Sequence, residues 1–106
     1  MCKSSLICRQ GSVLITRCPD CKTINIWHKT ALIIFSFEEF NEFVQATKGL
    51  VFEDYAEYNP EGTQVVVLPS TCLDICLVFT WQQWQDFFFA LHQTAYMQQV
   101  YEAFYG

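Results

Sequence analysis

The sequence lacks the stretches and motifs that mark several common classes of protein. Its longest apolar runs fall far short of the roughly 20 residues that a helix needs to cross a bilayer, so we expect no membrane span. It contains no G-x-S-x-G or H-E-x-x-H motif, and only four glycines with which to build a phosphate-binding loop. These gaps favour a protein that is not an enzyme.

A secretion signal is also missing from the first residues, MCKSSLIC, which hold no apolar segment with a cleavage site. We therefore expect a cytoplasmic protein, in which cysteine pairs more often bind metal or do redox work than form disulfides. The 106 residues, 52% of them hydrophobic, suffice for one domain, residues 1–106. We divide it into a meander with a first strand–helix unit (1–49), an acidic loop (50–63) and a second strand–helix unit (64–106).

Alternating short runs and two capped amphipathic stretches predict an α+β fold. Three short strands lie before residue 29, and ALIIF (31–35) predicts a fourth. Ser36-Phe37-Glu38-Glu39 has the pattern of a capping box, which predicts that a helix begins there. Thr80-Trp81-Gln82-Gln83 repeats the pattern before a second helix.

The two capped segments resemble each other. IIFSFEEFNEF (33–43) aligns with LVFTWQQWQDF (77–87) at an offset of 44 residues, and both Phe35 and Phe43 recur at the same places of the second segment. A single unit of this size cannot bury its own apolar face, so two copies would share a core. We therefore expect a small, mainly antiparallel, continuous sheet with both helices on one face, and we assign the aromatic stripes to the core and not to a cofactor.

RCPDCK (17–22) contains the clearest candidate for chemistry, the thiols of Cys18 and Cys21. A redox pair of this spacing needs a helix after the first thiol to lower its pKa. Here the alternating run TINIWH follows, which places the pair at the tip of a hairpin, as in a zinc knuckle. We expect a structural zinc site; thiols without metal and a redox pair are the alternatives.

Two more ligands are needed to complete a structural zinc site. A two-residue turn at Gln10-Gly11 would set Arg9 opposite Ser12 and bring Cys2 to the knuckle, while Cys8 would face Val13, about 16 Å away. If the first nine residues form a loop instead, Cys8 could reach the metal. In either case the fourth position is open: it would be filled by Cys8, Cys72 or Cys76, or by a group from outside the chain. We expect His28 and His92 to be ordinary histidines.

The order of these motifs resembles an uncharacterised family of short bacterial proteins. In that family a zinc-ribbon-like Cys-x-x-Cys hairpin precedes two units of a strand and a Ser/Thr-capped helix. RCPDCKTINI corresponds to the hairpin, LIIFSFEEFNEF to the first unit and VLPSTCLDICLVFTWQQWQDFFFAL to the second. The resemblance implies an architecture and no activity.

Charge and the C-terminal aromatics bear on possible partners. Five cations and one acid precede residue 38, a charge of +4, whereas Lys48 and ten acids follow, a charge of −9. The five cations of the N-terminal segment are weak evidence for a nucleic-acid-binding surface, so we do not expect nucleic-acid binding. A helix from Thr80 to Tyr105 would be roughly 37 Å long and would overhang the sheet with aromatic residues. We expect a homodimer through this helix; the alternative is a turn near residue 96 that folds the tail back.

These expectations give a non-catalytic, zinc-stabilised interaction domain, which leaves room for a protein partner. Thiol-redox chemistry at Cys18 and Cys21, and weak nucleic-acid binding, are the alternatives.

Overall fold

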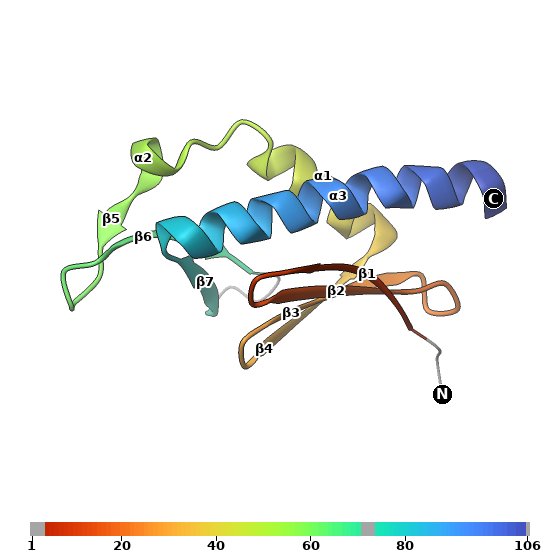
Figure 1. The fold of residues 1–106 in the computed structure, drawn as a ribbon, viewed down its shortest axis with the longest axis horizontal. Helices are drawn as coiled ribbons and strands as arrows, with labels where there is room; N and C mark the ends of the chain where they lie inside the picture. Colours follow the sequence, from red (N-terminus) through yellow and green to blue (C-terminus); the bar gives the residue numbers. More distant parts are fainter. Residues whose placement is uncertain (1–3, 71–73, 106) are drawn as a thin grey trace.

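The computed structural model describes residues 4–70 and 74–105, which form seven strands and three helices (Figure 1). The strands are β1 (Ser5–Gln10), β2 (Val13–Cys18), β3 (Thr23–His28), β4 (Ala31–Ser36), β5 (Glu57–Tyr58), β6 (Gln64–Pro69) and β7 (Cys76–Phe79). The helices are α1 (Phe37–Thr47), α2 (Phe52–Tyr55) and α3 (Trp81–Tyr105). The predicted α+β class is confirmed.

The strands form two antiparallel sheets, β1-β2-β3-β4 and β5-β6-β7. The expectation of one continuous sheet is therefore wrong. The two sheets stay apart at β4 and β7, where a hollow lined by apolar side chains of both strands, including Ile33, Ile34 and Leu77, separates the edges.

The acidic segment at residues 50–63 is not the plain loop that its composition indicates. It contains α2 and β5. Phe52 at the start of α2 is buried and belongs to the core, while β5 pairs with β6 through Glu57 and Val65. One apolar anchor and a short edge pairing therefore give structure to a segment whose composition is typical of a solvated loop.

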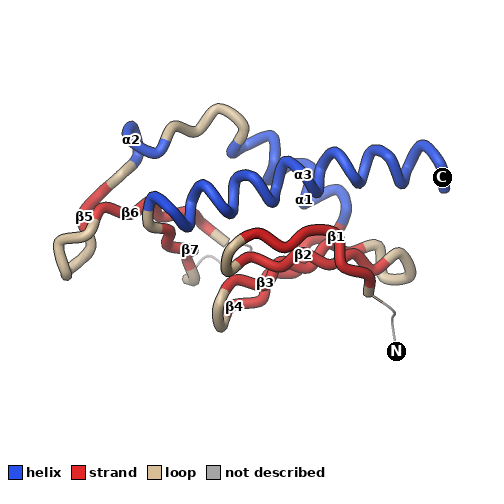
Figure 2. Tube along the Cα trace, viewed as in Figure 1, coloured by secondary structure: helices blue, strands red, loops and turns tan. Residues whose placement is uncertain are grey.

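The first sheet has one face in the core. Cys8, Ile15, Ile26 and Ile33 lie in register across β1 to β4, and all four are buried. The helices cover this face (Figure 2): α3 packs against β1 and β2, and α1 against β3 and β4. The expectation that both helices lie on one face is confirmed for this sheet.

Both predicted capping boxes are present. The Ser36 hydroxyl accepts from the Glu39 amide at 3.0 Å, and the Glu39 carboxylate accepts from the Ser36 amide at 2.9 Å. At the start of α3 the Thr80 hydroxyl accepts from the Gln83 amide at 3.4 Å, and the Gln83 side-chain oxygen accepts from the Thr80 amide at 3.1 Å. The helix then runs without a break to Tyr105, so the alternative of a turn near residue 96 is wrong.

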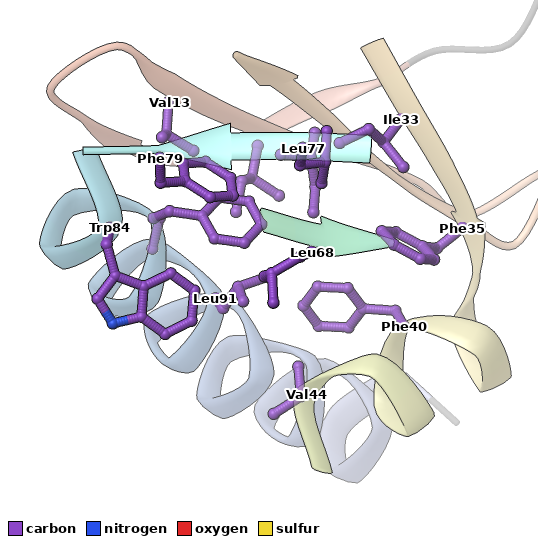
Figure 3. Packing of buried hydrophobic residues seen from close by; sticks show 14 of the residues in the cluster. Val13, Ile33, Phe35, Phe40, Val44, Leu68, Leu77, Phe79, Trp84 and Leu91 are labelled. Carbon is purple, nitrogen blue, oxygen red and sulfur yellow. The ribbon is translucent and has the colours of Figure 1, made fainter. Parts of the chain in front are cut away.

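The sequence repeat is visible in the core as matching ring contacts. Phe35 and Phe43 lie 5.0 Å apart between ring centroids, and their counterparts Phe79 and Phe87 lie 4.4 Å apart. Phe43 and Phe87 then meet each other edge to face at 6.2 Å. Figure 3 shows how strands and helices of both units direct their side chains into one cluster. The two units are therefore joined through equivalent rings.

Within the described residues, no helix is both long enough and apolar enough to cross a bilayer.

Candidate metal centre at the Cys18–Cys21 turn

Cys18 and Cys21 lie at a tight connection between β2 and β3. Cys18 pairs with Thr23, so only residues 19–22 form the loop. Lys22 closes it with a φ of 56°, in the left-handed region that few residues with side chains adopt. The Lys22 carbonyl then accepts a hydrogen bond of 3.1 Å from the Phe37 amide, which ties the loop to the start of α1. No helix follows the cysteines, as expected, because β3 begins at Thr23.

The loop directs a backbone amide at a sulfur. The Cys21 amide donates to Cys18 Sγ at 3.4 Å. Cys18 is only 2% exposed, whereas Cys21 is exposed. Two cysteines three residues apart in one tight loop suit metal binding once both are reduced, because thiolates are the ligands.

The cysteines differ in their bonding. Cys21 is in a disulfide, whereas Cys8, Cys18 and Cys76 are free thiols. Zinc coordination and disulfide formation compete for the same reduced thiolates. Cys21 can therefore bind a metal ion only after its disulfide has been reduced.

The candidate third and fourth ligands are not assembled in the described residues. Cys2 and Cys72 lie outside these residues. Cys76 is exposed on β7, opposite Pro69. In residues 4–70 and 74–105, no group of three or more His, Cys, Asp or Glu side chains could hold a metal ion.

The expected register of the first hairpin is wrong. Gln10 pairs with Val13, so the turn is Gly11-Ser12, and an irregularity at Ile7 shifts the pairing again. Cys8 therefore lies opposite Ile15, three residues or about 10 Å along the strand from Cys18. Cys8 is buried in the core, and burial raises the pKa of its thiol, which disfavours the thiolate that a metal needs.

The two histidines lie in aromatic surroundings away from the turn. His28, at the far end of β3, is buried, and its Nδ1 lies 3.2 Å from the Ser12 hydroxyl. Burial and the nearby charge of Lys29 lower its pKa. His92 on α3 contacts the Phe88 ring at 4.2 Å, and burial and the charge of Lys48 lower its pKa as well.

Arg17, the residue before Cys18, links the turn to both long helices. Its guanidinium carbon lies 4.9 Å from the Phe37 ring centroid and 4.7 Å from that of Tyr101, and its Nε donates to the Gln98 side-chain oxygen at 2.8 Å. Gln98 is 2% exposed. A cation held between two rings is a stabilising contact. The guanidinium of Arg17, one of the five cations of the basic N-terminal segment, is therefore engaged within the fold. The sequence contained no local sign of this contact, because its partners lie 20 or more residues away.

The site is thus a pair of cysteines, one a free thiol and one in a disulfide, in a turn that is anchored to α1 and α3. No family model matches the chain, and no curated protein or solved structure matches it significantly.

Proposed function

We propose that the protein is a non-catalytic interaction domain whose Cys18–Cys21 turn binds a structural zinc ion in the reduced state. The carrying observation is the hydrogen bond from the Cys21 amide to Cys18 Sγ within a four-residue loop. Tight turns of this kind point two sulfurs and their neighbouring amides at one ion. Cys2 is our candidate for a further ligand, and Cys8 is a weaker one because it lies in the core.

A metal at this turn would stabilise the fold as a whole. The loop is hydrogen-bonded to α1 through Phe37, and Arg17 next to it contacts α1 and α3. Binding free energy at such a site contributes to the free energy of folding. The metal would hold a scaffold in place, and the surface of α3 would provide the interaction.

The proposed interaction is self-association through α3. Large aromatic side chains remain exposed along this helix: Trp81, Phe89, Tyr96 and Phe104. Exposed apolar patches on small proteins usually mark interfaces, and a two-fold dimer is the commonest closed assembly. A different protein partner is the other occupant that this surface admits.

Metal analysis of protein purified under reducing conditions without chelator tests the zinc site. We expect stoichiometric zinc, lost in Cys18→Ser together with thermal stability, and retained in the control Cys76→Ser, which changes a free exposed thiol on β7. Cys2→Ser should weaken zinc binding more than His28→Ala, because His28 lies five residues, or about 16 Å, beyond Thr23 along β3. Protein that is folded, reduced and free of zinc would refute the proposal.

Thiol–disulfide chemistry is the second candidate, because Cys21 is in a disulfide while the Cys18 thiol beside it is free. This candidate predicts zinc-free protein whose thiols oxidise and reduce reversibly without loss of fold. Titration of free thiols in the same samples separates the two candidates: zinc-bound thiolates react slowly until a chelator is added, whereas a redox pair reacts at once.

A further inference from the structure

The helix α3 carries large aromatic side chains on its outer face, among exposed glutamines, as well as on the face that contacts the sheets. Phe87 and Leu91 are fully buried, yet Phe89 between them is 54% exposed. Thr94 and Gln98 are likewise buried. Residues two apart on an α-helix point about 200° apart, so Phe89 faces away from the core, and so does Tyr96 between the second pair. Large aromatic side chains exposed on a helix whose other face already lies in the core mark a candidate interface.

A groove of about 610 Å³ runs beside this outer face. Leu50, Val51 and Phe52 line one side of it, and α3 lines the other from Trp81 to Gln93. The Phe52 and Trp81 rings meet at 5.2 Å at one end. The groove therefore offers a mainly apolar surface, parallel to α3, against which a second elongated apolar element can pack.

The exposed aromatics of α3 have a symmetric spacing along the helix. Trp81 and Phe104 lie equally far on either side of the point between residues 92 and 93, and so do Phe89 and Tyr96. In a two-fold interface residue i contacts residue j while j contacts i. Two antiparallel copies of α3 would therefore place Phe89 opposite Tyr96 and Trp81 opposite Phe104, twice each.

The helix dipoles favour the same direction, because antiparallel helix dipoles attract.

We propose that α3 of a second copy lies antiparallel to this α3, with its Tyr96 and Phe104 in the groove between α3 and residues 50–53. This inference rests on the proposed self-association and adds to it the occupant of the groove, the direction of the helices and the residue pairs. It also explains why the C-terminal half of α3 carries apolar side chains beyond those that the sheet covers.

Charge rescue tests the pairing directly. Phe89→Lys and Tyr96→Glu should each weaken the dimer at least about tenfold, since interface aromatics of this kind contribute about 1–2 kcal/mol or more. An equimolar mixture of the two variants should dimerise again, because the lysine introduced in one chain then meets the glutamate introduced in the other. The control Ile34→Glu changes a residue of similar exposure, 55%, on the helix-free face of the first sheet, and should leave the dimer intact. Light scattering at micromolar concentration reports the mass, and circular dichroism confirms that each variant is folded.

The other outcomes are distinct. A monomeric parent protein overturns both self-association and this geometry. A dimer that is lost in both α3 variants but not restored by mixing keeps self-association and overturns the antiparallel pairing. A dimer lost only in Ile34→Glu assigns the interface to the sheet and overturns the proposal.

Discussion

Replacing Phe87 with alanine removes the ring through which the two repeats contact each other. Phe87 is fully buried, stacks on Phe79 at 4.4 Å and meets Phe43 at 6.2 Å. Truncation of a buried phenylalanine typically costs about 3–5 kcal/mol, and a domain of this size has about 5–15 kcal/mol of stability. We therefore expect Phe87→Ala to lose between about a fifth and all of the free energy of unfolding. Phe43 is only partly buried, so Phe43→Ala should lose less.

Urea unfolding followed by tryptophan fluorescence measures both losses. In a double-mutant cycle the coupling between Phe43 and Phe87 should be about 0.5–1.5 kcal/mol, the usual value for an edge-to-face ring pair. If Phe87→Ala leaves too little folded protein, Phe87→Leu keeps most of the volume and still removes the ring. A coupling of zero, or a loss below about 1 kcal/mol at Phe87, would refute the idea that equivalent rings join the two units.

Three further predictions concern single positions. Gly11 and Gly62 both have a positive φ, 57° and 82°, which costs a residue with a side chain about 1–2 kcal/mol. Of the two, only Gly11 lies where an alanine methyl would meet a side chain, that of Asp86. Gly11→Ala should therefore destabilise the fold more than Gly62→Ala, and equal losses of stability in urea unfolding would contradict this close approach. Ser36→Ala should cost about 1 kcal/mol by removing the helix cap, and an unchanged midpoint of thermal unfolding would count against the capping box. The pKa of His28 is lowered in the folded chain, so its contribution to stability is present above its ordinary pKa of 6.5 and is lost as the pH falls through the folded pKa. His28→Phe should therefore lose less stability on acidification than the parent. Identical profiles of unfolding free energy against pH would show that this imidazole is not desolvated.

Local sequence patterns predicted much of the fold. The Ser36 and Thr80 capping boxes depend on residues three apart, so the sequence alone places both helix starts correctly. The repeat likewise predicted that Phe35 and Phe43 would occupy the same role as Phe79 and Phe87, and the matching ring contacts confirm it. Both depend on short-range spacing, which a single sequence displays directly.

Features that depend on tertiary contacts could not be predicted from the sequence. Gly11 can occupy either position of a two-residue turn, and only its φ of 57° at the first position fixes the hairpin register. The irregularity at Ile7 and the separation of β4 from β7 have no local signature. At the candidate site, the turn at Cys18 was predictable from the change to strand alternation after Cys21, whereas the position of Arg17 between Phe37 and Tyr101 depends on packing over the whole length of the chain.

The contact between Phe43 and Phe87 has a consequence for biosynthesis. A ribosome adds about 5–20 residues per second, so the 44 residues between the two rings take about 2–9 s to make. During that interval the first unit is made while Phe43 is not yet covered by Phe87 of α3. The shared core can therefore be completed only after α3, Trp81–Tyr105, has been made.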